Sequence, residues 1–193
     1  TTPENKNVIL EVFTGISAGY DPHAHLISQN LHDANPNDVF LINIHTGGYS
    51  SPQGPGTDFR TSFGSAIAGQ TNLAGYPAGT VNRHEFPGLQ QNGTGTAMSR
   101  NQWSSASTQL LSQASPVNVG LQSSIDMTTN TLTVDVEVYY TGSQTISTNS
   151  LNIAIVQNGI LGPQSGGATG NPSAIDPATG LYTHQHMLRH MLT

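Results

Sequence analysis

Histidine is the residue type in this sequence with the most chemical potential, since eight of the 193 residues are histidines. His184 and His186 lie two positions apart, and on an extended strand that spacing places both imidazoles on one face. With His190 nearby, the three side chains could form a surface zinc or copper site. However, no His-Glu-x-x-His motif is present, and no carboxylate stands at ligand spacing near them. A packed or solvent-facing pair is therefore the favoured interpretation, and metal binding is the alternative.

The other histidines are expected to have structural roles. His23 and His25 fall on a predicted helix roughly 200° apart, so their side chains should point away from each other. His45, at the end of a predicted strand, and His84 are expected to hydrogen-bond to backbone or loops. The segment 171–180 has turn formers and oxygen ligands but too few carboxylates for a calcium loop, so we expect an ordinary turn.

Composition excludes several classes of function. The sequence contains no cysteine, so disulfides, thiolate nucleophiles and cysteine-ligated metals are ruled out. Only 8% of residues are charged, and five Lys plus Arg against a net charge of −6 leave no basic face for nucleic acid. No apolar run approaches the roughly 18 residues of a membrane span. Low charge and abundant Gly, Ser, Thr and Asn are typical of proteins exposed outside the cell, and a lipid anchor outside this numbering is left open.

The elements that must position these residues follow a strand-helix order in the first part of the chain. Apolar runs predict strands at 8–13, 39–44 and 79–82. Helices are predicted from Asp21 to just before Asn35, over 59–70, and from Ser99 through a stripe of apolar residues (Trp103, Ala106, Leu110 and Leu111). A β-α-β-α-β order of this kind predicts a sheet covered by helices.

The pattern changes at Ser115-Pro116. Segments 117–125, 131–140 and 151–156 alternate with a period of two, which predicts antiparallel strands and a small β-sandwich. Three or four strands cannot close a sandwich, so we expect the natural protein to continue beyond residue 193. The predicted organisation is thus an α/β domain over 1–115 and an antiparallel, incomplete β-sandwich over 116–193.

The sequence resembles the Omp28-related outer-membrane proteins of Bacteroidota along nearly its whole length. The similar blocks are 10–15 with 17–22 (LEVFTG and SAGYDP), 41–45 (LINIH), 75–83 (GYPAGTVNR) and 182–189 (YTHQHMLR). Members of that family are similar in having a thioredoxin-like domain followed by a β-sandwich. The resemblance therefore implies that 1–115 is a thioredoxin-like domain.

The departure from the family concerns its two redox cysteines, which this sequence replaces with Ala18 and Asp21. Thiol–disulfide exchange needs a thiolate that attacks a disulfide sulfur, and neither residue can do that. We expect no enzymatic activity and no cofactor. Asp21 is instead expected to cap the helix that follows, with Pro22 at its first position, where a carboxylate contributes roughly 0.5–2 kcal/mol.

The resemblance also places Pro77 where thioredoxin-like proteins have a cis-proline that faces the redox turn. If that groove persists without cysteines, its walls would be Tyr20, Tyr76 and Pro77, and it would bind an extended peptide through backbone pairing. The alternative is that Pro77 merely closes a turn before the strand at Thr80.

The expected function is that of a redox-inactive protein at the outer-membrane surface or outside the cell, a non-catalytic component of an assembly with other proteins. An unpaired strand edge near 181–192 would suit such an assembly, because open edges pair with other chains. The alternatives are a peptide-binding module that uses the groove and a histidine-based metal-binding protein.

Overall fold

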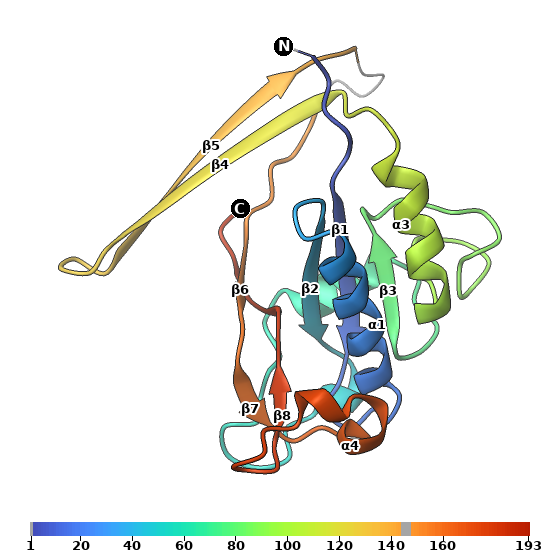
Figure 1. The fold of residues 1–193 in the computed structure, drawn as a ribbon, viewed down its shortest axis with the longest axis vertical. Helices are drawn as coiled ribbons and strands as arrows, with labels where there is room; N and C mark the ends of the chain where they lie inside the picture. Colours follow the sequence, from blue (N-terminus) through green and yellow to red (C-terminus); the bar gives the residue numbers. More distant parts are fainter. Residues whose placement is uncertain (1, 144–147) are drawn as a thin grey trace.

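A five-stranded mixed sheet forms the centre of the computed structural model, which describes residues 2–143 and 148–193 (Figure 1). The strand order is β3-β1-β2-β9-β6, and the strands are β1 (Val8–Thr14), β2 (Val39–His45), β3 (Ala78–Val81), β6 (Ala154–Gln157) and β9 (Met187–Met191). β1, β2 and β9 run parallel, while β3 and β6 run antiparallel to their neighbours. The predicted α/β class is therefore confirmed.

Two helices, α1 (Asp21–Ala34) and α2 (Gly64–Gly69), connect the first three strands in the predicted order, and α3 (Trp103–Leu111) follows β3. Two short 3-10 turns, η1 (Gly48–Ser50) and η2 (Arg100–Gln102), precede α2 and α3. The order β1-α1-β2-α2-β3, with β3 antiparallel to β1, agrees with the expected thioredoxin-like arrangement. α2 is shorter than the predicted 59–70, because Phe59 leaves the helix path to pack against Ile16 and Met187.

Side chains that alternate along the strands are buried on both faces of the central sheet. On one face Val8, Leu10 and Val12 pack against Trp103 of α3 and Ala24 of α1. On the other face Phe13 and Ile44 pack against Ile67 and Ala68 of α2. This explains why the apolar runs of β1 and β2 are nearly continuous rather than alternating.

The chain after residue 116 does not form two facing sheets within the described residues. β4 (Val117–Asp126) and β5 (Thr131–Tyr140) form a two-stranded antiparallel hairpin that extends away from the body (Figure 1). β7 (Ile160–Gly162) and β8 (Tyr182–His184) form a second small sheet, joined by α4 (Gly167–Gly170) and η3 (Pro172–Ala174). The hairpin confirms the two strands predicted at 117–125 and 131–140, but the expected β-sandwich is not observed.

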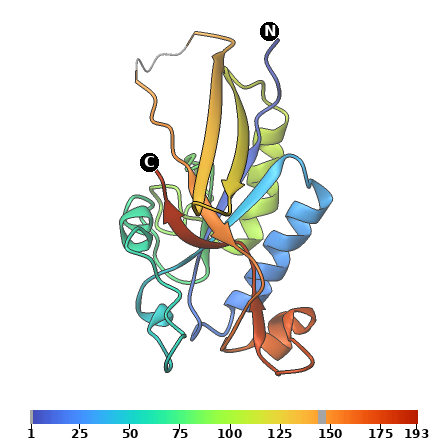
Figure 2. The same cartoon turned by 90° about the vertical axis from the view of Figure 1, so that its left-hand side faces the viewer.

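The predicted strand at 151–156 is shorter, as β6, and pairs with β9 rather than with β5. Through β9 both strands join the sheet that β1 and β2 begin, as Figure 2 shows from a second direction. The boundary predicted at residue 115 therefore does not coincide with a boundary between sheets. The physical reason is that the outer edge of β2 offers unpaired backbone groups, which β9 satisfies.

Candidate functional site

The turn at the expected redox position links the end of β1 to the start of α1. α1 begins at Asp21 itself, and Tyr20 occupies the N-cap position without a side-chain capping bond. The predicted capping role of Asp21 is thus wrong in detail. Its Oδ2 instead accepts hydrogen bonds from the Gly15 amide and the Thr14 hydroxyl, each at 2.7 Å. Burial raises the pKa of this carboxyl to about 6, although both hydrogen bonds oppose the rise.

Residues 163–170, named here the covering segment, lie on this turn. The Ser165 amide donates to the Ile16 carbonyl at 2.8 Å. The Gln164 side-chain amide donates to the carbonyls of Gly15 and Ala18, each at 3.2 Å. Ala18 is accordingly 7% exposed. The chain itself therefore occupies the backbone groups of this turn.

A chain of buried hydrogen bonds runs from the turn to the late part of the sequence. Asn171 Nδ2 lies 3.2 Å from the Tyr182 hydroxyl, which lies 3.1 Å from His25 Nδ1. His25 Nε2 lies 2.9 Å from the Thr14 hydroxyl, which donates to Asp21. All five side chains are buried. This hydrogen-bond network thus connects α1 with β8 and with the loop before β8.

The donors and acceptors in this chain point in one direction, which assigns the histidine tautomer. The hydroxyl of Tyr182 accepts from Asn171 and donates to Nδ1 of His25, so the His25 proton sits on Nε2 and points at Thr14. Burial lowers the pKa of His25 to about 3, so that its ring is neutral, and raises the pKa of Tyr182 to about 12. A buried network of this kind favours one packing of the elements it joins, although Asp21 Oδ1 at its end has no hydrogen-bond partner among the described residues.

Two further buried imidazoles lie beside this network of hydrogen bonds. The rings of His45 and His184 are 5.3 Å apart between centroids, and Phe59 packs edge-on against both. Burial lowers the pKa of His184 to about 4 and that of His45 well below its ordinary value. Among the described residues neither ring nitrogen of His45 has a hydrogen-bond partner, which contradicts the expected backbone bond. Both residues are therefore neutral core side chains.

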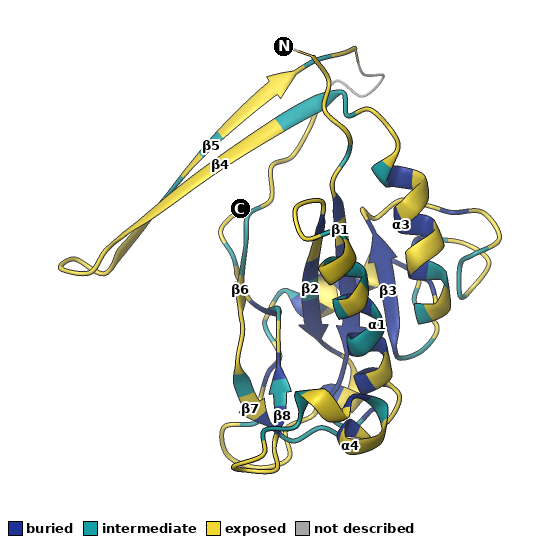
Figure 3. Cartoon of the chain, in the orientation of Figure 1, coloured by how far each residue is buried: buried dark blue, intermediate teal, exposed yellow. Residues whose placement is uncertain are grey.

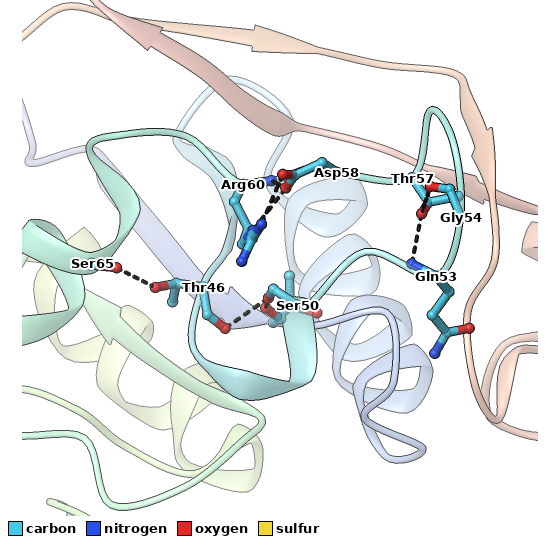
Figure 4. Close-up of polar contacts among 9 residues, drawn as sticks. Thr46, Ser50, Gln53, Gly54, Thr57, Asp58, Arg60 and Ser65 are labelled. Carbon is cyan, nitrogen blue, oxygen red and sulfur yellow. Dashed lines mark hydrogen bonds and ion pairs between the residues drawn. The ribbon is translucent and has the colours of Figure 1, made fainter.

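The loop between β2 and α2 carries Phe59, and Figure 4 shows the polar contacts within this loop. The Ser50 hydroxyl bonds to the carbonyls of Thr46 and Thr14, at 2.7 and 2.8 Å. Arg60 and Asp58 form an exposed two-pronged ion pair beside it, at 2.8 Å for each contact. The loop thereby connects the end of β2 to the end of β1.

The three predicted walls of a peptide groove lie in different surroundings. Tyr20 is 72% exposed, and the Arg100 guanidinium lies 5.6 Å from the centre of its ring. The half-buried Tyr76 instead packs edge-on against Tyr49. The Tyr76–Pro77 peptide bond is cis, and Pro77 is buried. Peptide binding at this place remains a prediction.

The three histidines predicted as weak metal ligands point to different places. His184 faces Phe59, His186 lies beside His32, and His190 packs on Phe63. The expectation that His184 and His186 share a face is wrong, because His186 adopts a left-handed φ of 52° between β8 and β9. Within residues 2–143 and 148–193, no group of three His, Asp or Glu side chains could hold a metal ion.

The β4–β5 hairpin carries a row of exposed apolar side chains, which we name the apolar face. Directly paired residues share a face, and one face consists of Val117/Tyr140, Val119/Val138, Leu121/Val136, Ser123/Val134 and Ile125/Leu132. The opposite, polar face carries Asn118, Gln122, Ser124, Asp126, Thr131, Thr133, Asp135 and Glu137, together with Gly120 and Tyr139. Leu121 is 62% and Ile125 is 64% exposed, and much of the hairpin is exposed in Figure 3.

A cavity of about 1010 Å³ lies between the base of the hairpin and the central sheet. Val117 and Leu121 of the apolar face form one wall. The facing wall is mixed, with apolar residues of the sheet (Ile9, Phe40, Ile42, Val156 and Leu188) and polar ones (Asn7, Asn82 and Arg83). Arg83 holds the buried Glu11 carboxylate through two contacts of 2.6 and 2.8 Å. The two walls of the cavity therefore differ in polarity, because the hairpin side is apolar and the sheet side is mixed.

Sequence reasoning did not find Thr14, Tyr182, Asn171 or Gln164 as residues of this region. The one available signal was the spacing of Tyr182 and His184, which do alternate on β8 and are both buried. Among the described residues, no helix is long and apolar enough to cross a bilayer.

The arrangement of strands and helices defines a mixed α/β protein with a thioredoxin-like order of elements. No protein-family model matches the sequence, and no curated protein matches it significantly. Among solved structures, the chain is similar to HBP35 of Porphyromonas gingivalis, with a TM-score of 0.67 and 21% sequence identity. The similarity covers 100% of this chain and 58% of that one. At this identity the likeness concerns the fold.

Proposed function

We propose that this protein is a non-catalytic interaction component of an assembly at the outer-membrane surface or outside the cell. The observation that carries the proposal is the bare apolar face of the β4–β5 hairpin. A two-stranded hairpin is at best marginally stable in water unless a further surface covers its apolar side. Contiguous apolar surface of this kind marks an interaction site on soluble proteins.

The chemistry of the former redox turn supports a role without catalysis. Ala18 and Asp21 stand where thiols would be required, and the covering segment occupies the backbone of the turn. The same occupation gives the peptide-groove alternative less support, because Ser165 already bonds to Ile16 at that turn.

The proposed location rests on resemblance and composition. The sequence resembles Omp28-related proteins of Bacteroidota, and the structural neighbour is a protein of Porphyromonas gingivalis, which belongs to the same phylum. The low content of charged residues, 8%, fits a chain held by other protein surfaces outside the cell.

Native mass spectrometry of the protein isolated from cells that produce it tests the proposal. We expect a complex heavier than one copy of the polypeptide, whose own mass a denaturing spectrum of the same sample gives. Leu121→Asp places a charge on the apolar face and should dissociate the complex, whereas Gln122→Lys, which places a charge on the polar face opposite Asp135, should leave it intact. A wild-type protein whose native mass equals that of the single polypeptide would overturn the proposal.

A further inference from the structure

A second, smaller cavity of about 280 Å³ lies where the first helix meets the late part of the chain. We name it the polar cavity. Its lining comes from α1, from β2, from the loop before β8, and from β8 with the turn that follows it. No residue of the β4–β5 hairpin lines it. An occupant of the polar cavity is therefore a separate question from the partner of the apolar face.

The polar cavity is rich in hydrogen-bonding groups but has no charged wall. Ten of its twelve lining residues are polar, and none is Asp, Glu, Lys or Arg. Burial lowers the pKa of both lining histidines, to about 3 for His25 and below the ordinary value for His186, so both rings are neutral at pH 7. A charged occupant would lose its hydration without gaining a counter-charge from the wall. An apolar occupant would leave the polar wall unpaired. The cavity therefore suits a neutral, polar molecule.

The polar groups of the wall are of two complementary kinds. Four lining residues carry a carboxamide: Gln29, Asn43, Asn171 and Gln185. Four others carry a hydroxyl: Ser28, Ser173, Tyr182 and Thr183. A carboxamide presents a donor and an acceptor side by side, and a hydroxyl can both donate and accept. Two neighbouring hydroxyls of one ligand can pair with a single carboxamide, so this wall matches a molecule that carries several adjacent hydroxyls.

Hydrogen bonds between the lining residues hold the wall in place without an occupant. Asn43 Nδ2 donates to the Gln185 carbonyl at 2.7 Å, and His186 Nε2 lies 3.2 Å from Gln29 Oε1. The Oδ1 atom of the buried Asn43 has no hydrogen-bond partner among the described residues. Packing alone would favour an apolar side chain at such a position in a central strand. The asparagine therefore indicates that this wall serves a polar occupant, and the fixed geometry lowers the cost of binding it.

We propose that the polar cavity binds a neutral sugar, either as a free monosaccharide or as the terminal residue of a neutral glycan. Its volume lies at the lower end of the roughly 300–1,000 Å³ of ligand pockets, which suits one sugar ring. This inference goes beyond the proposed function and does not depend on it, because the hairpin takes no part in the site.

An NMR titration of the ¹⁵N-labelled chain tests the proposal with glucose, galactose, mannose and N-acetylglucosamine as probes. For at least one of them we expect saturable shifts of the backbone amides of Thr183, Gln185 and His186, with a Kd in the millimolar range. Glucuronate and glucosamine carry a negative and a positive charge on the same ring. We expect each to bind roughly tenfold or more weakly than the neutral sugar of the same ring.

Two pairs of variants locate the site. Ala174→Phe fills the polar cavity without removing a hydrogen-bonding side chain, whereas Ala178 is exposed and does not line it, so Ala178→Phe is the control. Gln29→Leu removes one carboxamide, and Asn30→Leu changes the next residue of α1, which is exposed. We expect Ala174→Phe and Gln29→Leu to weaken binding by roughly tenfold or more and the controls to leave it unchanged. Fluorescence of Trp103, the single tryptophan and a buried core residue, verifies that each variant keeps its fold.

Methyl glycosides of the sugar that binds distinguish its two sources. Binding of a methyl glycoside as tight as that of the free sugar identifies the end of a glycan, and binding of the free sugar alone identifies a monosaccharide. Three results would overturn the proposal. They are the absence of saturable shifts with all four neutral sugars, equal binding of the charged sugars, and unchanged affinity in folded Ala174→Phe and Gln29→Leu.

Discussion

The hydroxyl oxygen of Tyr182 lies 3.1 Å from Nδ1 of His25, so strand β8 is bonded to helix α1 across 157 positions of sequence. The same hydroxyl receives a hydrogen bond from Asn171. Because all three groups are buried, water cannot replace either bond if one is lost. These two hydrogen bonds therefore hold β8 and the loop before it against α1.

Replacement Tyr182→Phe tests this contact. It leaves His25 Nδ1 and Asn171 Nδ2 without partners in the interior, and we expect the free energy of unfolding to fall by about 1–3 kcal/mol. Urea unfolding followed by Trp103 fluorescence measures the change. Tyr139→Phe removes the hydroxyl of a half-exposed tyrosine on the hairpin and should change little. Equal stability of the two variants would contradict the role assigned to the buried chain.

Stability should decrease as the pH falls from 6.5 to 4. The pKa values of His25 and His184 are lowered to about 3 and about 4, and that of His45 is lowered as well. Below pH 6.5 the unfolded chain therefore binds protons that the folded chain does not, which favours unfolding. The urea midpoint measured across this range reports the effect.

Asp21 acts in the opposite direction over part of that range. Its pKa is raised from 3.8 to about 6, so between these values the folded state binds the proton more readily, and stability rises as the pH falls. Asp21→Asn removes this compensation, and we expect a steeper decline in stability than in the wild type. A flat profile in the wild type, or a shallower one in the variant, would contradict the assignment of the buried groups.

Gly166→Ala should detach the covering segment from the turn. Gly166 has a φ of 72°, and a Cβ at this position would collide with the carbonyl of Gly19. We expect amide exchange at Ser165 to accelerate by roughly tenfold or more. Gly180→Ala is the matched control, because Gly180 has a φ of 70° but open space around it. If amide hydrogen exchange at Ser165 is equally fast in both variants, backbone strain alone explains it and the collision with Gly19 does not.

The Arg83–Glu11 ion pair should matter more than the exposed pair of Arg60 and Asp58. Arg83→Met leaves the buried Glu11 carboxylate without its partner, and we expect a loss of about 1–3 kcal/mol because Arg83 is partly exposed. Arg60→Met should cause no measurable change, since both side chains of its pair lie in solvent. Urea unfolding of the two variants compares them, and an equal loss would count against the distinction.

Elements fixed by local pattern were predictable from the sequence. The apolar runs at β1 and β2 and the signals at Asp21 and Asn35 located two strands and α1 closely. The alternation in β4 and β5 predicted their pairing. The pairing of β6 with β9 was not predictable in the same way, because the preference for β9 over β5 depends on contacts distant in sequence.

The site was less predictable than the fold, for a physical reason. Thr14, His25 and Tyr182 carry no shared local motif, and only the tertiary fold brings their polar atoms together. The period-two argument failed at His186 because β8 ends at His184, and His186 has a left-handed backbone conformation in the turn before β9. At α2, packing of Phe59 into a separate cluster prevailed over local helical periodicity.

The position of β9 in the central sheet has a consequence for the order of folding. β2 can pair with β1 on one side early in synthesis. Its other side can pair with β9 only after Met187 has emerged from the ribosome. Until then, one edge of β2 remains open to pairing with other chains. A sheet completed by distant strands also folds slowly. The chain is therefore vulnerable to aggregation while it is being made, and its central sheet becomes complete only once β9 is available.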